Sequence, residues 1–351
     1  MRMSMRRVGA VARRIIVQFL RDRRSLGLLF VAPIVVLTLV GALWGSPATT
    51  TARVIAAGDV DPQLYAALGG TPLELRALDH DAAIEELKAG RADAVIEFDS
   101  TGAVVTLDGS DPTHTGAVVG AVQGALTDLI IGSPLASAVK VQYLYGGPAY
   151  TLLDYLAPVL IAVFAFFFIF LLSTVSFLRE RTSGTLERLL ATPITRAELV
   201  LGYLAGFALF ALVQAVVILL FTVFVLKVQY RGNLATIFIV EAALVVGAVS
   251  LGLAISAFAR NELQAVQFVP LVLLPQVFLS GLLVPVDQLN DVLRAISAVL
   301  PLTYANEALR SVMVKGYALS DPLILRDIGI LAGFAIVMAV LAVASIRREV
   351  A

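Results

Sequence analysis

LLDYLAPVLIAVFAFFFIFLLSTVSF, residues 152–177, is the stretch that decides the fold class. It contains a single charged residue, Asp154, and exceeds the roughly 20 residues that a helix needs to cross a hydrocarbon core of about 30 Å. The whole chain has the same character, because 59% of its 351 residues are hydrophobic and 15% are charged. Its mean hydropathy is +0.91. The composition therefore predicts an α-helical polytopic membrane protein.

Six apolar runs are predicted to span the membrane. They cover residues 25–45, 152–177, 198–226, 234–258, 263–284 and 326–346. The length of the first run suits a retained anchor better than a cleaved signal peptide. Cysteine is absent, which excludes disulfides and thiolate metal sites.

Lysine and arginine are distributed unevenly over the segments that flank these runs. Residues 1–24, residues 178–197, Arg260, Arg347 and Arg348 together carry fifteen of them, against six in the short segments on the other side. Positive charge favours the cytoplasmic side, so both termini are predicted to be cytoplasmic. The net charge is zero, which gives no reason to expect a nucleic-acid partner.

Residues 46–151 are too polar to enter a membrane and too long for a simple loop. Strands are predicted at 52–58 and 92–99, a helix at 79–90, and a strand with a turn at 103–113. A small α/β extracytoplasmic domain is therefore expected between the first and second spans. From residue 53 to residue 140 it holds 13 Asp and Glu against 5 Lys and Arg. This acidic surface could attract cationic solutes or be an ordinary soluble surface.

Residues 1–24 are predicted to form an interfacial amphipathic helix on the cytoplasmic leaflet, with basic side chains meeting anionic headgroups. One helical face carries the apolar residues Val8, Val11, Ala12, Ile15 and Phe19, and the opposite face carries Arg7, Arg14 and Arg21. The helix could also touch a cytoplasmic partner, or only anchor the chain.

The polar stretch RERTSGTLERLLATPITRAEL, residues 179–199, separates two long apolar runs. Gly184 permits a sharp departure from the preceding span, and Pro193 ends a short helix that places Leu186, Leu189 and Leu190 on one side. Thr195 and Glu198 have the spacing of a capping box, and Ile194 and Leu199 that of a hydrophobic staple. This segment is either a well-made hairpin connector or a rigid docking element for a cytoplasmic protein.

A second unusual region begins inside the fifth apolar run. Pro270, Pro275, Gly281 and Pro285 predict a helix that is kinked or broken near its outer end. Residues 285–325 are amphipathic on both sides of Pro301, which predicts re-entrant helices in the outer leaflet.

Glu241 is the ionisable residue deepest inside a predicted span. It could contact a cationic cargo or hold a polar neighbour such as Gln214. Alternatively, it could be a protonated or snorkelling side chain near the interface. Glu241, Gln214, Pro275 and Gly281 are therefore candidate pathway residues.

These segments together resemble the ABC-2 type permeases, the membrane subunits of ATP-driven exporters. The resemblance rests on RERTSGTLERLLATPITRAELVLGY, between the second and third spans, and on FLSGLLVPVDQLNDVLRAISAVLPLTYANEALRSVMVKG, between the fifth and sixth. It covers essentially the whole chain and indicates the subgroup with a large outer domain after the first span. It implies a coupling helix that docks on the ATPase subunit, formed by Gly184, Thr185, Leu186, Glu187, Leu189 and Leu190.

The resemblance implies two cytoplasmic ABC ATPase subunits and a second permease subunit, identical or related, in a bacterial cytoplasmic membrane. Amphipathic drugs, antibiotics or lipids are the expected cargo, and sodium extrusion is the alternative within the family. A membrane receptor or sensor with a ligand-binding outer domain is the alternative from another class.

Several catalytic motifs are absent from the sequence. No G-x-x-x-x-G-K-[ST] loop occurs, so ATP and Mg²⁺ are expected in a separate subunit and no cofactor is expected in this chain. Neither a nucleophile elbow, nor H-E-x-x-H, nor an intramembrane pair of carboxylates is present, and the two histidines are His80 and His114. Catalysis and metal binding by this chain are therefore not predicted.

Overall fold

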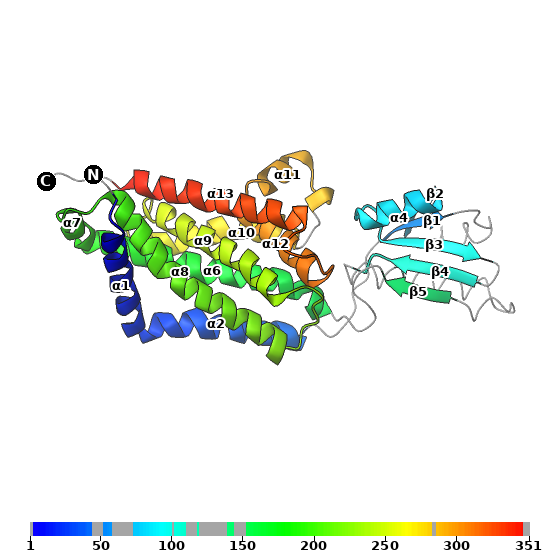
Figure 1. The fold of residues 1–351 in the computed structure, drawn as a ribbon, viewed down its shortest axis with the longest axis horizontal. Helices are drawn as coiled ribbons and strands as arrows, with labels where there is room; N and C mark the ends of the chain where they lie inside the picture. The colour runs from blue at the N-terminus through cyan, green and yellow to red at the C-terminus, as the bar shows by residue number, and fades with distance from the viewer. Residues whose placement is uncertain are drawn as a thin grey trace. The chain divides into compact units, whose positions relative to one another are not determined.

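The computed structural model (Figure 1) describes residues 3–43, 52–57, 73–99, 102–109, 118, 139–143, 152–282 and 286–346. The chain divides into two compact units. One joins Met1–Gly41 to Leu156–Ala351, and the other is Ala42–Tyr155. The described elements of the first unit are helices, and those of the second include a β-sheet.

Five helices in the described ranges are long and apolar enough to cross a membrane. They are α6 (Leu152–Thr182), α8 (Arg196–Leu220) with its π-helical continuation η2 (Phe221–Val225), α9 (Leu234–Ser256), α10 (Glu262–Leu279) and α13 (Pro322–Ser345). The predicted first span corresponds to α2 (Arg23–Leu43), in which the apolar helix Ser25–Leu39 is shorter than these five. Residues 44 and 45 lie outside the described residues, so a sixth span stays a prediction.

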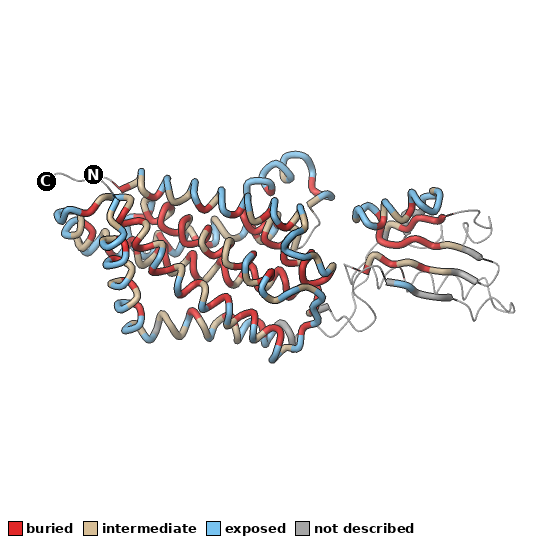
Figure 2. Tube along the Cα trace, in the orientation of Figure 1, coloured by how far each residue is buried: buried red, intermediate tan, exposed pale blue. Residues whose placement is uncertain are grey.

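α9 is the most enclosed of the five long helices, and it packs against α8 and α13. Figure 2 shows its buried residues inside the helical unit, while much of α13 is exposed on its outer side. Exposed apolar side chains such as Leu274 on α10 and Val340 on α13 fit helices that present an outer face to lipid. The unit is therefore packed around α9.

α10 ends close to the place where the sequence predicts a kink or break. It runs without interruption through Pro270 and Pro275 and ends at Leu279, where Ser280 is the C-cap and Gly281 has φ +83°. Each proline removes one backbone donor, but the neighbouring i→i−4 bonds hold the helix together. The break therefore comes after Leu279, several residues before the predicted end at 284, while Pro285 lies outside the described residues.

Three short elements follow α10: the 3₁₀ turn η3 (Val286–Gln288), α11 (Asp291–Ser297) and α12 (Pro301–Met313). Pro301 stands in the first turn of α12, where its missing N–H costs no helical bond. α12 is buried along most of its length and contacts α9 and α13, whereas α11 is largely exposed. The depth of these helices in a membrane stays a prediction.

The second unit contains a five-stranded sheet in the order β2-β1-β3-β4-β5. The strands are β1 (Ala52–Ala57), β2 (Leu73–Leu78), β3 (Ala94–Asp99), β4 (Gly102–Leu107) and β5 (Val139–Tyr143). The β3–β4 pair is antiparallel and the other pairs are parallel. α4 (His80–Lys88) packs Ala83 and Leu87 against Ile55 and Val95 of the sheet. The sequence analysis did not anticipate β2 or β5.

Two further helices, α1 (Met5–Arg21) and α7 (Thr185–Leu190), lie at the same end of the helical unit (Figure 1). α7 stands between α6 and α8 in the chain. This end contains the polar stretch that separates two apolar runs in the sequence.

Candidate functional site

The connector between α6 and α8 is a short, rigid projection. Gly184 has φ +69°, a left-handed conformation that glycine adopts without a Cβ penalty, and it is the N-cap of α7. After Ala191 the chain turns through Thr192 and Pro193 and enters α8 at Thr195. A loop reversing direction needs fewer residues than this, so the segment presents a defined surface.

The side chains of α7 point in two directions. Leu186 is buried, so it anchors α7 on the helical unit. Glu187 and Arg188 are exposed, and Leu189 and Leu190 are half-buried. The surface open to a partner is therefore centred on Glu187 and Arg188 rather than on all three leucines.

Glu198 fixes the far end of the connector. Its Oε2 accepts a hydrogen bond from the Thr195 amide at 2.8 Å, while the Glu198 amide donates to Thr195 Oγ1 at 3.2 Å. These two bonds form the capping box of α8. Glu198 Oε1 also accepts a bond of 2.6 Å from the amide of Ser4, and Arg7 lies 3.5 Å from Oε2. One carboxylate thus joins the start of α8 to the start of α1.

Glu180 fixes the near end of the connector. Arg14 of α1 donates from one nitrogen, Nη2, to both oxygens of Glu180, at 2.9 and 2.7 Å, and Gln18 donates to Oε1 at 3.2 Å. Burial is the largest single influence on Arg14 and disfavours its charge, but the bond to Glu180 and the charges of Tyr203 and Glu180 together outweigh burial and raise the pKa of Arg14. α1 therefore binds both ends of the α6–α8 connector.

The apolar face of α1 packs closely on α8. A Cβ on Gly202 would lie 2.5 Å from Val11 Cβ, and one on Gly206 would lie 2.9 Å from Ile15 Cβ. Phe19 packs its ring against Phe210, with centroids 4.7 Å apart. The sequence placed Arg7 and Arg14 at lipid headgroups. In the structure these arginines bond carboxylates of α8 and α6, because the small residues of α8 let α1 approach, and their contact with headgroups stays a prediction.

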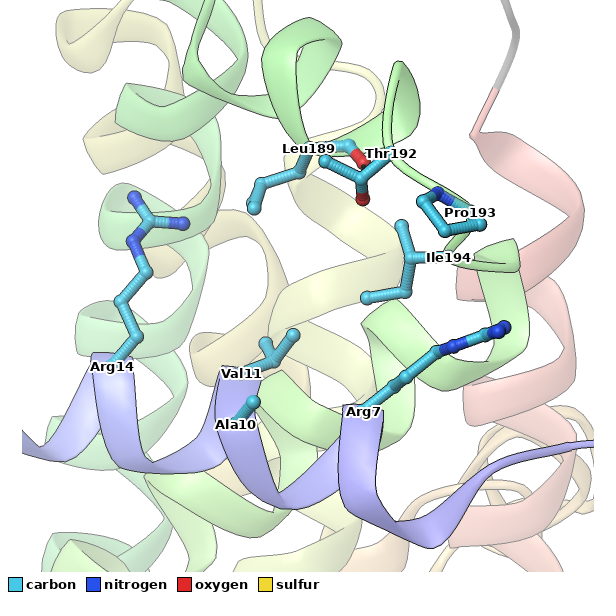
Figure 3. A pocket seen from close by; sticks show the side chains of 8 residues that line it. All are labelled: Arg7, Ala10, Val11, Arg14, Leu189, Thr192, Pro193 and Ile194. Atoms are coloured by element: carbon cyan, nitrogen blue, oxygen red, sulfur yellow. Dashed lines mark hydrogen bonds between the residues drawn. The ribbon is translucent and has the colours of Figure 1, made fainter.

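A pocket of about 380 Å³ lies between α1 and the connector. Its walls combine apolar groups with two guanidinium groups, as Figure 3 shows, and the lining residues are Arg7, Ala10, Val11, Arg14, Leu189, Thr192, Pro193 and Ile194. Such a surface suits an apolar side chain from a partner, accompanied by negative charge.

Further links tie the connector to the other long helices. Arg179 donates to both oxygens of Glu262 at the start of α10, at 2.9 and 3.2 Å. Arg181 donates to the Ser256 carbonyl at the end of α9 at 2.7 Å. Displacement of the connector would therefore be transmitted to α1, α9 and α10 as well as to its own helices.

The candidate pathway residues do not form one cluster. Glu241 is fully buried in α9, and neither of its carboxylate oxygens has a hydrogen-bond partner among the described residues. Gln214, the polar neighbour named as one alternative for Glu241, donates to the Phe164 carbonyl of α6 at 3.4 Å. Pro275 is on the exposed side of α10, and Gly281 directly follows its C-cap.

A buried polar seam joins the end of α10 to α12, and the sequence analysis did not identify it. Asn306 donates to Ser280 Oγ at 2.7 Å and to the Ser280 carbonyl at 3.2 Å. Gln276 accepts from the Leu302 amide at 3.4 Å. The signal in the sequence was the group of polar residues inside an otherwise apolar block, but it does not specify their partners.

The sequence matches the family model of the ABC-2 family transporter proteins over residues 23–344. It is 34% identical to ABC transporter G family member 20 of Dictyostelium discoideum over 175 residues, which are 50% of this chain and 24% of that protein. It is 28% identical to the probable multidrug ABC transporter permease YbhS of Escherichia coli K12 over 240 residues, which are 66% of this chain and 62% of the relative.

A third relative is the linearmycin resistance permease protein LnrN of Bacillus subtilis strain 168, which is 29% identical over 158 residues. That match covers 45% of this chain and 40% of LnrN. In all three comparisons the matched part is less than two thirds of the relative's own length.

Proposed function

The chain belongs to the ABC-2 family of transporter proteins, and from that premise we propose that it is the permease subunit of an ATP-driven exporter. It is a multi-pass membrane protein and a transporter subunit rather than a catalytic enzyme. ATP and Mg²⁺ would be held by a separate ABC ATPase, because this sequence has no phosphate-binding loop.

The observation that carries the proposal is the connector around α7. It stands at one end of the helical unit, it leads into the capping box of α8, and α1 binds Glu180 and Glu198 on either side of it. A rigid projection of this kind can receive force from a partner and pass it on without deforming. We assign α7 as the docking element for the ATPase, with Glu187 and Arg188 exposed on it and Leu189 beside the pocket.

The proposed assembly contains two permease subunits and two ATPase subunits in a bacterial cytoplasmic membrane, with both termini on the cytoplasmic side. ATP binding would bring the ATPase subunits together and push α7. Because Arg179 and Arg181 connect that end to α10 and α9, the push would re-pack the long helices. For this to drive transport, ATP must favour one of the two packings over the other.

An amphipathic drug, antibiotic or lipid is the proposed cargo. The long helices offer mainly apolar side chains, which cannot replace the water around a strongly polar solute. Among the relatives, one is a probable multidrug permease and another is a linearmycin resistance permease. Sodium is the second candidate, and the measurement below separates the two.

The test is to purify the tagged chain from its own organism, so that a natural ATPase is retained, and to measure ATP hydrolysis in lipid. Neutral amphiphiles, cationic amphiphiles and Na⁺ are titrated separately. Leu189→Asp and Arg188→Glu are compared with the matched control Asp291→Lys, which changes an exposed charge on α11.

We expect an ATPase to co-purify and to be stimulated by an amphiphile. Leu189→Asp and Arg188→Glu should weaken its retention roughly tenfold, the loss that follows from removing one central contact. The control should retain it fully. Absence of any ATPase would favour the sensor alternative, whereas full coupling in both α7 variants would refute the docking assignment.

A further inference from the structure

Glu241 and Gln214 are two buried polar side chains whose oxygen atoms the packing of the helices leaves unused. Glu241 is 0% exposed and Gln214 is 1% exposed. Both oxygens of Glu241 and Oε1 of Gln214 have no hydrogen-bond partner among the described residues. All three atoms are acceptors when the carboxyl is ionised, so each of them lacks a donor or a cation.

Both side chains are placed beside α6. Gly252 of α9 faces α6, because a Cβ there would overlap the Ser173 hydroxyl and lie 2.9 Å from the Phe170 carbonyl. Glu241 precedes Gly252 by three helical turns and therefore lies on the same face of α9. Gln214 reaches α6 from α8 through its bond to the Phe164 carbonyl.

The two side chains also lie at similar depth. α6 and α9 run in the same direction, since Arg181 near the end of α6 bonds the carbonyl of Ser256 at the end of α9. Gly252 lies beside residues 170–174 of α6, and Glu241 lies three turns before Gly252. The part of α6 that lies level with Glu241 is therefore within about one turn of Phe164, whose carbonyl accepts the bond from Gln214. Glu241 and Gln214 thus flank the same part of α6.

α6 carries two buried aromatic rings in this part of its length. Phe166 and Phe170 are fully buried and stacked with centroids 5.7 Å apart. This part of α6 is therefore apolar, and a carboxylate buried beside it needs a counter-charge.

No basic side chain in the described part of the chain forms a hydrogen bond with Glu241. The charged residues on α6 and on the helices that pack around α9 are Asp154, Arg179, Glu180 and Arg181 on α6, Arg196 and Glu198 on α8, Glu262 on α10, Glu307 and Arg310 on α12, and Arg326 and Asp327 on α13. Arg179 bonds Glu262, and Arg181 bonds the Ser256 carbonyl. Arg326 is bound by Glu307 and Asp327, at 2.8 and 2.7 Å. An ionised Glu241 without a counter-charge would be strongly disfavoured here.

We propose that Glu241 and Gln214 form an intramembrane cation site that holds a proton in this packed state and exchanges it for a monovalent cation when the helices open. The exchange conserves charge: the carboxyl releases its proton to water as the cation binds the carboxylate and the amide oxygen. The cation is Na⁺ or a lipophilic organic cation. As a cargo site it rests on the proposed export function, but its occupancy can be measured without transport.

The test uses the purified full-length chain in lipid nanodiscs and the reagent dicyclohexylcarbodiimide, which modifies protonated carboxyl groups in apolar surroundings. Modification of each carboxyl is measured by peptide mass spectrometry at about pH 6 and about pH 9. Na⁺, tetraphenylphosphonium and the neutral, similarly shaped triphenylphosphine oxide are added in separate reactions. Asp291, a fully exposed carboxyl, is the internal control.

We expect modification at Glu241 and none at Asp291. Protection by more than half with Na⁺ would identify the inorganic ion, and protection by tetraphenylphosphonium but not by the neutral analogue would identify an organic cation. Gln214→Leu should leave the modification intact and abolish the protection. The modification should be weaker at the higher pH when the protecting cation is present.

An unmodified Glu241 in the folded protein would overturn the proposal, and so would modification that neither cation prevents. These outcomes are separate from those of the export test, because neither ATP nor a partner is used. Export without cation protection would leave the transporter assignment standing and refute this site. Cation protection without a co-purifying ATPase would leave this site standing and refute the transporter assignment.

Discussion

Arg14 and Glu180 show how a single ion pair holds two distant parts of the chain together. Glu180 is almost fully buried, with 5% of its side chain exposed, whereas Arg14 retains 33%. The carboxylate therefore cannot turn to solvent if its partner is lost, but the guanidinium can. The two members of the pair should respond differently to removal.

Arg14→Ala is expected to destabilise the protein more than Glu180→Ala. The first leaves a buried carboxylate with only the amide of Gln18, and the second leaves a half-exposed cation that can hydrate. The loss for Arg14→Ala should be on the order of 1–3 kcal/mol. Apparent melting temperatures of the two variants in lipid would show which of them is less stable.

The control is Glu85→Ala, which removes the exposed pair with Lys88 in α4, 3.4 Å apart. It should change stability very little, since exposed pairs contribute about 0–1 kcal/mol. Equal melting temperatures for Arg14→Ala and Glu85→Ala would contradict the assigned role of the Arg14–Glu180 pair.

His80 is the residue of the α/β unit whose protonation should be measurable. A hydrogen bond and the charge of Glu97, together with the charges of Asp81 and Asp79, raise the pKa of His80 above its ordinary value of 6.5. A raised pKa means that the folded state favours the protonated ring. The resulting stabilisation is complete below pH 6.5 and is lost as the pH rises through the folded-state pKa.

Histidine-selective NMR labelling would show this titration, because the chain has only two histidines. We expect the His80 midpoint to lie above 6.5 and to fall towards that value in Glu97→Gln. A wild-type midpoint at or below 6.5 would show that the His80–Glu97 contact does not form in solution.

At the scale of elements, the sequence predicts what is encoded locally. The capping box of α8 needs only Thr195 and Glu198, which are three residues apart, and both are legible in the sequence. The bond between Ser4 and Glu198 joins residues 194 positions apart, and the bond between Arg14 and Glu180 spans 166. Periodicity carries no information about such contacts, so the partners of α1 could not be anticipated.

Other elements show where local patterns were incomplete or misleading. β2, LELRAL, alternates polar and apolar residues at its start, a strand signal that was present but short. Pro270, Pro275, Gly281 and Pro285 predicted a kink or break near the outer end of α10, and the helix continues through the first two prolines and ends just before Gly281. Leu186 shares a helical side with Leu189, but only tertiary packing decided that Leu186 is the buried anchor.

Asn306 tests whether α10 and α12 move as one body. Asn306→Ala removes two hydrogen bonds and leaves the buried Ser280 hydroxyl without its donor, which should cost on the order of 1–3 kcal/mol. Asn306→Asp should cost more, because it places a buried carboxylate oxygen against the Ser280 carbonyl, which can only accept. The free energy of unfolding of both variants would be measured by following proteolytic cleavage within α12.

The matched control for this seam is Asn290→Ala at the exposed N-cap of α11, where the loss should be about 1 kcal/mol. If Asn306→Asp were as stable as wild type, the amide orientation in the seam would be wrong. The seam could then not hold α12 to α10.

At the scale of the whole molecule, the contacts of α1 bear on the number of spans. α1 bonds Glu180 near the end of α6, so α1 and that end lie on the same side of a membrane. α6 itself accounts for one crossing, so this contact predicts a further crossing between Arg21 and Leu152. α2 is the described helix there with an apolar run, which supports the predicted first span.

The side of each segment follows from the number of long helices between it and α1, and the natural absence of cysteine allows single cysteines to report that side. Single cysteines at Gly9, Glu187, Asp81 and Asp291 would report on α1, α7, α4 and α11. Three long helices, α8, α9 and α10, separate α7 from α11, so those two elements must lie on opposite sides. Four long helices, α6, α8, α9 and α10, separate α4 from α11, so α4 and α11 are predicted to lie on the same side of the membrane.

In intact cells a membrane-impermeant maleimide should therefore modify Asp81→Cys and Asp291→Cys but not Gly9→Cys or Glu187→Cys, which should react only after permeabilisation. The excess of arginine beside α1 and α7 predicts that their side is cytoplasmic. Reaction of Gly9→Cys together with Asp291→Cys would mean that α2 does not cross, and the contacts between α1 and α6 could then not exist in the membrane. Reversal of all four results would keep the helix count and place α7 out of reach of a cytoplasmic ATPase.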